Sequence, residues 1–413
     1  ITSNAVVVYD SVVLYVDDLI IEEGGYLEFR NGGQTVWHNG DWNISGTVLT
    51  NHETHRINVS IDGEFGINVL GGNFTIMNGT NITNGESATA EYYFNVLGNF
   101  SLENSFVSEM ISNGINLRSG SSINELGNIS FYDNLGFALS LGEDISLSGD
   151  LNVDGSCFNI TADDVILDLN GYNITGSDNG AYRGIQAIGK DNITIMDGLI
   201  EWFGKSVFDG AGIFLEYVDN SVIENIIISN NAYSLNLFSD SNNNNLYNIT
   251  TTLNNGPGIY LQGNVNNNNF YNVISISNND DGISLSNGPN NNSFYNTTIN
   301  LNSDDGLKLI SSSNNTFNNL NSYSNGGLEV NYISGEGNKM IYNNSYGQMS
   351  FIDDLDYDIE GTLRIGPGYN IEIGNNSAYL NSSGDISELN KSANVSLELT
   401  GGSFSNPVIY RTS

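Results

Sequence analysis

Two pairs of aspartates are the residues whose type and spacing most directly suggest chemistry. Asp280–Asp281 and Asp304–Asp305 each precede a glycine and lie 24 residues apart. If the two pairs occupy the same turn in successive repeats, four carboxylates come together at one edge of the molecule. Such a cluster could bind Ca²⁺ or supply the acid and base of a glycosidase. The simplest interpretation remains a solvated Asp-Asp-Gly turn.

A second acidic segment, residues 352–361, alternates acidic and apolar side chains. In a strand, Asp354, Asp356, Asp358 and Glu360 would share one face. This face is a candidate Ca²⁺ site. Otherwise it is a charged edge strand that discourages mispairing with other chains.

The histidines and the cysteine suggest less. His52 and His55 flank Glu53, but the order is not that of a zinc protease, and the only other histidine is His38. We therefore expect no metal site there. Cys157 is the only cysteine, which excludes an internal disulfide, and we expect it to be a small buried residue.

A repeat of about 23 residues must position these candidates. The first marker is a Gly-apolar-x-apolar motif, which begins at Gly212, Gly258, Gly282, Gly306 and Gly327, with Ser234 in the same role. The second marker is an apolar-x-Asn motif, which begins at Ile223, Leu246, Phe270, Phe294, Phe317 and Ile341. Short alternating strands at this period, without helical spacing, predict an all-β fold, a right-handed parallel β-helix.

Stacked coils place equivalent residues directly above one another, about 4.8 Å apart. We therefore expect an internal aliphatic ladder of Ile259, Ile283, Leu307 and Leu328. An aromatic ladder should contain Phe270, Phe294 and Phe317. A row of asparagines should form corners or an amide ladder, because Asn tolerates left-handed backbone and its amide both donates and accepts. This row consists of Asn225, Asn248, Asn272, Asn296, Asn319 and Asn343.

Two segments carry a resemblance to a known family. ADDVILDLNGYNITG (162–176) and RGIQAIGKDNITIMDG (183–198) resemble the entry coils of NosD-like right-handed β-helix proteins. The resemblance extends over about 150–345 and is weaker over 60–150. It implies the fold, and Asn-rich versions are common among archaeal surface proteins. It implies little about function, because this fold hosts lyases, hydrolases and structural proteins.

The catalytic patterns of such enzymes are incomplete here. There is no Gly-His-Gly and no Arg-Ile-Lys pattern. Lyases of this fold need a basic catalytic residue, and the local bases are only Arg183, Lys190, Lys205 and Lys308. We expect no base close to the stacked aspartates and therefore no enzymatic activity.

The amino-acid composition limits the partners that the protein can have. The 413 residues carry 47 Asp plus Glu but only 11 Lys plus Arg, for a net charge of −36. This excludes a nucleic-acid partner, because nothing could neutralise a run of phosphates. No apolar run is long enough for a membrane span. The 69 asparagines supply a surface that is polar without being charged.

Nineteen Asn-x-Ser/Thr sequons favour an extracellular, N-glycosylated protein of the cell surface. Three of them, Asn248, Asn296 and Asn343, belong to the asparagine row, where we favour the corner or ladder role over a glycan. The remaining candidates for glycosylation are Asn43, Asn58, Asn73, Asn78, Asn81, Asn99, Asn128, Asn159, Asn173, Asn192, Asn291, Asn314, Asn375, Asn381, Asn390 and Asn394.

We expect three regions: an N-terminal β-rich cap or assembly segment (1–60), the parallel β-helix (61–345) and an incomplete β-sandwich-like module (346–413). The incompleteness suggests an excerpt of a longer protein. The N-terminal segment either caps its own helix or pairs with another copy, because open strand edges template pairing. The apolar residues available for such assembly are Val6, Val8, Val12, Leu14 and Val16.

The main functional prediction is a self-assembling structural subunit of an archaeal filament, sheath or surface layer. It requires no cofactor, with Ca²⁺ as the one ion considered, and its partners are copies of itself and surface glycans. One alternative is a polysaccharide-active hydrolase or lyase. Another is a carbohydrate-binding adhesin that uses exposed aromatic rings, with Tyr260, Tyr271, Tyr295 and Tyr323 as candidates.

Overall fold

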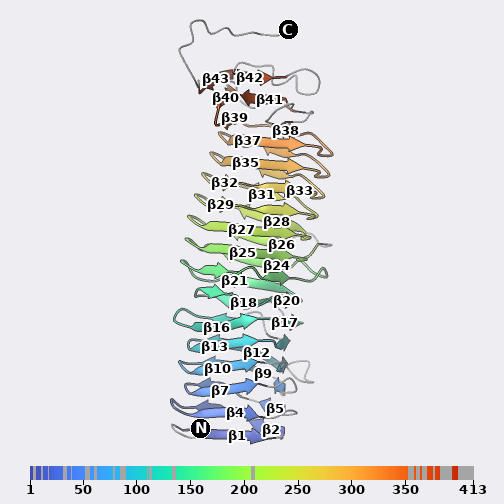
Figure 1. Cartoon of the computed structure of the whole chain (residues 1–413). Coiled ribbons are helices and arrows are strands. Elements are labelled where there is room, and N and C mark those ends of the chain that lie inside the picture. Colours follow the sequence, from blue (N-terminus) through green and yellow to red (C-terminus); the bar gives the residue numbers. More distant parts are fainter. Residues whose placement is uncertain are drawn as a thin grey trace.

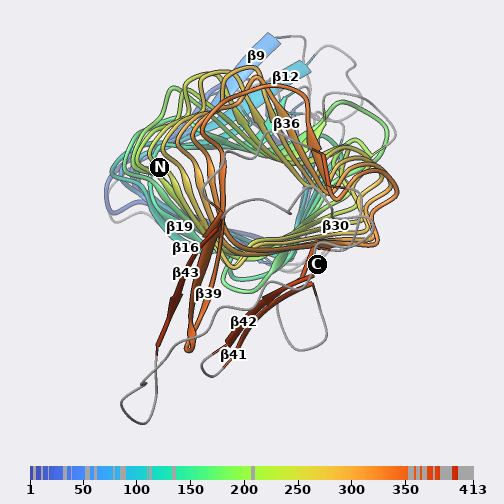
Figure 2. The same cartoon turned by 90° about the horizontal axis from the view of Figure 1, so that it is seen from above.

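The computed structural model is a continuous stack of β-coils (Figure 1). It describes residues 1–398 except 3–5, 11–12, 17, 31–34, 39, 52–55, 60–62, 78–79, 84–89, 109, 111–113, 133–135, 206–209, 352–357, 360–362, 365–369, 375–376 and 382–392. Seen along the stack, successive coils superimpose around one axis (Figure 2). No helix among these residues is long and apolar enough to cross a membrane.

Three parallel sheets make up the stack. Sheets B and C run along its length, whereas sheet A spans only the coils of residues 6–127. Sheet A contains β1 (Val6–Asp10), β4 (Tyr26–Arg30), β7 (Thr47–Asn51), β10 (Asn73–Met77), β13 (Asn99–Glu103) and β16 (Ser122–Gly127). Sheet C contains β3 (Leu19–Ile21), β6 (Trp42–Ile44), β9 (Gly63–Val69), β12 (Ala90–Val96), β15 (Ile115–Leu117), β18 (Phe137–Leu141), β21 (Ser156–Ile160), β24 (Arg183–Ile188), β26 (Ala211–Glu216), β28 (Tyr233–Phe238), β31 (Ile259–Gln262), β34 (Ile283–Ser286), β36 (Leu307–Ile310) and β38 (Val330–Tyr332).

Sheet B completes each coil. It contains β2 (Val13–Val16), β5 (Thr35–His38), β8 (Arg56–Val59), β11 (Asn81–Thr83), β14 (Phe106–Ser108), β17 (Ile129–Tyr132), β19 (Ile145–Ser146), β20 (Leu151–Val153), β22 (Ile166–Asp168), β23 (Asn173–Thr175), β25 (Thr194–Glu201), β27 (Val222–Ser229), β29 (Asn245–Tyr247), β30 (Thr250–Thr252), β32 (Asn269–Tyr271), β33 (Ile274–Ile276), β35 (Ser293–Asn300), β37 (Thr316–Tyr323) and β39 (Lys339–Asn344). The predicted right-handed parallel β-helix is therefore the fold of this chain.

Interior side chains stack in register, as the alternation predicted. Ile259 pairs with Ile283, and Ile283 with Leu307, all fully buried. The next residue of this ladder is Val330 and not Leu328, so that expectation was wrong. Leu328 lies only 21 residues beyond Leu307, which is too short for the coil; its backbone instead precedes β38 and accepts a hydrogen bond from Gly306.

The aromatic ladder forms as predicted on the sheet B side of the core. The rings of Phe270 and Phe294 stack with centroids 4.3 Å apart, and those of Phe294 and Phe317 with centroids 5.2 Å apart. All three side chains are buried. Face-to-face contact follows from the fold, because the coil spacing is close to the thickness of a ring plus its van der Waals contact.

The predicted asparagine row bends sheet B and also forms a ladder. From Asn225 to Asn319, each member has a φ between 54° and 57°. From Asn248 to Asn319, each amide donates to the side-chain oxygen of the equivalent Asn one coil earlier, for example Asn272 to Asn248 at 3.0 Å. Asn343 departs from the predicted row, because its amide donates to Asn318. The same residues thus turn the corner with their backbone and form the ladder with their side chains. A glycan on Asn248 or Asn296 would have to break this ladder.

A second set of asparagines lies inside the corners and was not predicted. Two buried rows run along the stack, each at one edge of sheet B. The first row is Asn231, Asn254, Asn278, Asn302 and Asn325, and the second is Asn244, Asn268, Asn292, Asn315 and Asn338. Each side-chain oxygen accepts from the backbone N–H of the preceding member of its row and, except between Asn244 and Asn268, also from that member's amide. These rows thus satisfy backbone groups that the turns leave unpaired.

The stack begins earlier than the predicted boundary at residue 61. β1 pairs in parallel with β4, β2 with β5, and β3 with β6. The described strands within residues 1–60 therefore belong to the first coils of the β-helix rather than to a separate segment.

The parallel repeat ends after β39. β40 (Gly347–Phe351) pairs antiparallel with β39 and with β43 (Ala393–Leu397), and β41 (Ile371–Gly374) pairs antiparallel with β42 (Ser377–Leu380). Ile359 and Leu363 bridge to the last coil and are fully buried. This part of 346–413 therefore covers the C-terminal end of the core. Much of the predicted β-sandwich-like module falls on residues outside the described set, so the module stays a prediction.

The buried asparagine rows should carry much of the stability of the stack. Asn278 accepts two bonds from Asn254 and donates to Thr251, Ser275 and Asn302. Asn278→Ala should lower the free energy of unfolding by about 2–3 kcal/mol, because a backbone N–H is left buried without a partner. Asn272→Gly, in the exposed ladder, is the control. It should cost about 1 kcal/mol or less, because glycine accepts the left-handed corner. Denaturant titration followed by circular dichroism measures both, and equal losses would contradict the role of the inner row.

Candidate functional site

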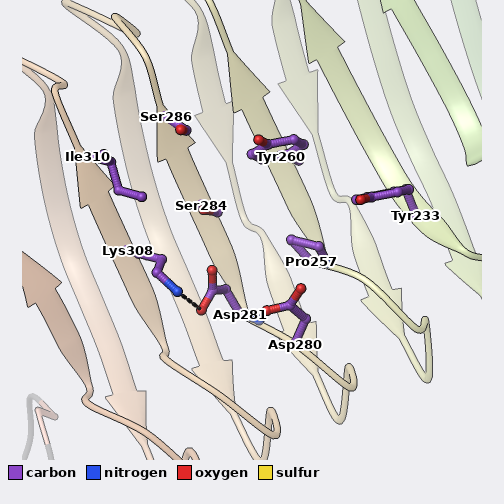
Figure 3. Close-up of a pocket in the computed structure, with 9 residues that line it drawn as sticks. All are labelled: Tyr233, Pro257, Tyr260, Asp280, Asp281, Ser284, Ser286, Lys308 and Ile310. Atoms are coloured by element: carbon purple, nitrogen blue, oxygen red, sulfur yellow. Dashed lines mark hydrogen bonds and ion pairs between the residues drawn. The ribbon is translucent and has the colours of Figure 1, made fainter. Parts of the chain in front are cut away.

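A groove of about 210 Å³ opens on the outer face of sheet C (Figure 3). It spans four successive coils. Its lining residues are Tyr233, Pro257, Tyr260, Asp280, Asp281, Ser284, Ser286, Lys308 and Ile310.

The depression arises from side-chain size at one outward position. Tyr260, Ser284 and Lys308 are the third residues of the motifs GIYL, GISL and GLKL, and they stack in register on neighbouring strands. The small Ser284 lies between two long side chains, so it forms the floor between them. Two residues further along the same strand, the small Ser286 pairs with the larger Ile310 on the neighbouring strand.

One wall of the groove is aromatic. The rings of Tyr233 and Tyr260 lie 18° from parallel, with centroids 6.1 Å apart. Burial raises the pKa of Tyr260, a hydrogen bond with Ser286 opposes this shift, and the nearby charges of Asp280 and Asp281 add to it. Tyr260 is therefore a neutral phenol that presents both an apolar ring and a polar hydroxyl to the groove.

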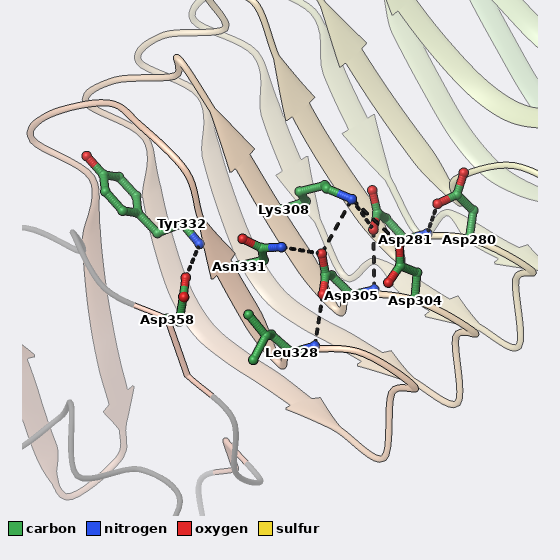
Figure 4. A network of polar contacts seen from close by, with 9 residues as sticks. All are labelled: Asp280, Asp281, Asp304, Asp305, Lys308, Leu328, Asn331, Tyr332 and Asp358. Carbon is green, nitrogen blue, oxygen red and sulfur yellow. Dashed lines mark hydrogen bonds and ion pairs between the residues drawn. The ribbon is translucent and has the colours of Figure 1, made fainter.

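The opposite end is a compact ionic network (Figure 4). Lys308 Nζ lies 3.2 Å from Asp281, 3.4 Å from Asp305 and 3.6 Å from Asp304. Side chains of Asp281 and Asp305 are only 5% exposed, whereas Asp304 is 55% exposed. The two aspartate pairs thus meet across neighbouring coils. The expectation that no base lies near them was wrong, because Lys308 is part of the next strand and projects back over the turn.

Hydrogen bonds hold these carboxylates in place. Asp305 accepts from the backbone of Leu328 at 2.8 Å and from the amide of Asn331 at 2.6 Å. Asp281 accepts from the backbone of Asp305 at 3.3 Å, and the backbone of Asp281 donates to Asp280 at 2.8 Å. The cluster is therefore part of a built network rather than a set of freely solvated turns.

Burial raises the pKa of the Asp281 carboxyl to about 6, although the charge of Lys308 opposes the shift. For Lys308, burial lowers the pKa, but the carboxylates of Asp281, Asp305 and Asp304 more than offset this, so the pKa is raised. Desolvation outweighs the ion pair for Asp281 and not for Lys308, because the side chain of Asp281 is the more deeply buried of the two.

Carboxyl oxygens of Asp280, Asp281 and Asp304 lie within 4.8 Å of one another, a spacing that suits a metal ion. Lys308, however, already places a cation among these carboxylates. Ca²⁺ would have to compete with this ammonium, and Ca²⁺ binding here stays a prediction.

Other predicted site residues lie elsewhere or outside the described residues. Asp358 accepts a hydrogen bond from the backbone of Tyr332 at 2.9 Å. Cys157 is buried, and burial raises the pKa of its thiol, which leaves it unreactive. Outside the described residues are Asp354, Asp356, Glu360, His52, Glu53, His55 and Val12. Val6 and Val8 lie in β1, and Leu14 and Val16 in β2.

Of the four tyrosines proposed as carbohydrate platforms, only Tyr260 lines the groove. Tyr271 stacks between Tyr247 and Tyr295, at 4.9 and 4.8 Å, so its faces are covered by neighbouring rings. The guanidinium of Arg364 lies 4.1 Å from the ring centroid of Tyr323. Sequence reasoning missed Tyr233, Pro257, Ser284, Ser286 and Ile310, although the outward position of each motif pointed to the strand face that they share.

The sequons differ in accessibility. Exposed asparagines are Asn73, Asn99, Asn128, Asn192, Asn291, Asn314 and Asn394, and half-buried ones are Asn43, Asn159, Asn173 and Asn381. Asn58 and Asn81 lie on β8 and β11, and Asn78, Asn375 and Asn390 lie outside the described residues. Glycosylation of these sites stays a prediction.

Comparison with known proteins agrees with the fold. Residues 156–321 match the family model described as "Right handed beta helix region". This chain is a parallel β-helix repeat protein. No curated protein is similar to the chain at a significant level. The NosD-like and archaeal character suggested by the sequence stays a prediction.

Several solved structures share the fold at low similarity. A mutant of the periplasmic alginate epimerase AlgG is 14% identical, with a TM-score of 0.45 and 76% of each chain covered. The AlgE4 A-module, a mannuronan C-5 epimerase of Azotobacter vinelandii, is 11% identical, with a TM-score of 0.21 and coverage of 80% and 82%. The Dettilon tailspike protein is 12% identical, with a TM-score of 0.27 and coverage of 81% and 58%.

Lys308 should be essential to the ionic network. Lys308→Met should lower the free energy of unfolding by about 2–4 kcal/mol at neutral pH, because buried carboxylates lose their counter-charge. The pKa of Asp281 then rises further above 6. A carboxyl whose pKa is raised by folding favours the folded state in acid, and this contribution is lost as the pH rises through the raised pKa.

The difference in melting temperature between wild type and Lys308→Met should therefore be larger well above pH 6 than well below it. Lys339→Met, at an exposed lysine, is the control and should show little change at either pH. Thermal unfolding at the two pH values tests this, and a difference independent of pH would show that Asp281 does not respond to Lys308.

Proposed function

We propose that this chain is an extracellular carbohydrate-binding β-helix protein that holds a glycan in the sheet C groove. The observation that carries the proposal is the pairing of an aromatic wall, Tyr233 and Tyr260, with a polar floor and an ionic end. Sugar rings present both apolar faces and hydroxyls. Binding sites commonly combine aromatic side chains with a few positioned polar groups.

The repeat geometry suits a chain-like ligand. The lining residues lie on consecutive coils, so a different side chain follows at each strand spacing of about 4.8 Å along the axis of the stack. Ser284 and Ser286, only 4% and 8% exposed, form a floor that a ligand can approach. A glycan lying across these coils would contact the tyrosines and the carboxylates together.

We propose binding without turnover. Asp281 and Asp305 are engaged by Lys308 and by backbone N–H groups, so neither is free to move a proton without breaking the network. Hydrolysis is the second candidate, favoured by the raised pKa of Asp281, about 6, with Asp280 beside it. Reducing-end release that Asp281→Asn abolishes would replace binding with catalysis.

We also propose a cellular location, glycosylation and self-assembly for this protein. The sequons and the scarcity of Lys and Arg support a glycosylated cell-surface protein, of the NosD-like archaeal kind. Self-assembly into a filament, sheath or layer is supported by β1, which is the terminal strand of sheet A and has one edge without a partner strand among the described residues. Deleting residues 1–16 and measuring particle size tests this, and unchanged assembly would exclude the N-terminal interface.

Tyr260→Ala should weaken glycan binding about tenfold or more, because it removes one face of the aromatic wall. Tyr295→Ala is the control, since Tyr295 belongs to a half-buried tyrosine stack on sheet B, away from the groove. Affinity electrophoresis in gels containing dextran, glycol chitosan or alginate gives the retardation of each variant. If the wild type is retarded by none of these polymers, or both variants lose retardation equally, the groove is not the binding site.

A further inference from the structure

The charged side chains around the groove are mainly acidic. Around it lie four carboxylates, of Asp280, Asp281, Asp304 and Asp305, and one ammonium, of Lys308. Their formal sum is −3 when all are ionised. Lys308 is the only Lys or Arg among the lining residues.

Lys308 is not available to a ligand carboxylate. Its Nζ already lies within 3.6 Å of three carboxylates. The next base along sheet C is Arg183, which pairs through Ala211 to Tyr233 and therefore lies two coils beyond the groove. Its guanidinium is 3.7 Å from the ring centroid of Phe214. A uronate approaching the groove would thus meet net negative charge and, among the residues that line it, no cation other than the ion-paired Lys308.

We propose that the groove selects glycans that carry ammonium groups, such as unacetylated amino sugars, and rejects uronates; this rests on the proposed function. Asp304 is the exposed member of the cluster, and Asp280 is half-buried at the rim, so both can reach an incoming cation. At the distance of an ion pair, opposite charges near a protein surface attract by an amount that exceeds thermal energy.

A second observation points to a ligand beside these carboxylates. Ser284 lines the floor of the groove, is only 4% exposed, and is labelled between Tyr260 and Lys308 in Figure 3. The hydroxyl of Ser284 borders the groove, so a sugar hydroxyl or amine lying there can form a hydrogen bond with it.

The experiment compares three tetrasaccharides by isothermal titration calorimetry at moderate salt: tetra-glucosamine, tetra-N-acetylglucosamine and tetra-mannuronate. Short oligomers reduce the multivalent attraction of a polycation to a protein of net charge −36. We expect the glucosamine oligomer to bind at least tenfold more tightly than its acetylated form and the mannuronate oligomer to show no binding. Equal affinity for the amine and acetylated forms, or tighter binding of mannuronate, would overturn the charge selection.

Asp280→Asn tests the site itself, since an asparagine oxygen can still accept from the backbone of Asp281. It should weaken binding of the glucosamine oligomer about fivefold, the effect of one nearby charge. Glu23→Gln, which removes one exposed charge at the far end of the stack, is the matched control and should have no effect. Equal weakening in both variants would mean a diffuse attraction and no selective groove.

The outcomes separate this inference from the proposed function. If the acetylated oligomer binds as tightly as the glucosamine oligomer, or the uronate oligomer binds more tightly, and Tyr260→Ala abolishes that binding, carbohydrate binding stays in place and the preference for amines is removed. Binding of no oligomer and no polymer would remove both.

Discussion

The register between neighbouring coils is the constraint on which the structure depends. Each inward side chain must meet its equivalent one strand spacing away, so an error of one residue would exchange the inner and outer faces. The inner asparagine rows enforce this register at the corners, where no β-ladder exists. The side-chain oxygen of Asn292, for example, accepts from the backbone and the amide of Asn268, and the backbone and amide of Asn292 donate to the side-chain oxygen of Asn315. A corner built this way can be repeated without strain, since a residue such as Asn291, with φ of 57°, supplies the turn.

The same rows have a direction, and this requires a special residue at the end. Along the first row each amide donates toward the next coil, so the last member, Asn325, needs an acceptor that belongs to no further Asn. Glu329 fills this position: its carboxylate accepts from Asn325 at 2.6 Å and from Ser322 at 2.8 Å. Burial raises the pKa of Glu329, and these bonds oppose the shift. A buried carboxylate is tolerable here because it ends a chain of donors.

Much of the fold could be predicted from the sequence, because two markers shared one period and alternation assigned the inward face. Ile259, Ile283 and the phenylalanine ladder follow directly from that rule. The inner asparagines could not be predicted, since in the run 242–245 nothing in residue type distinguishes the buried Asn244 from the corner residue Asn243. The aspartate pairs were found, but the groove was not, because its depth depends on the relative size of outward side chains on separate coils.

The position of Lys308 shows how a repeat produces a site without disturbing its own core. The outward position of the Gly-apolar motif contributes nothing to interior packing, so Tyr260, Ser284 and Lys308 can differ freely while Ile259, Ile283 and Leu307 stay equivalent. Fold stability and surface chemistry are thereby carried by alternate residues of the same strand. The buried carboxylate of Asp281 is then tolerated because a cation, Lys308, reaches it from the next coil, only one strand spacing away. Binding chemistry on such a scaffold is set by which unlike residues stack side by side, and the groove is the place on sheet C where an aromatic, a small and a charged residue do so in succession.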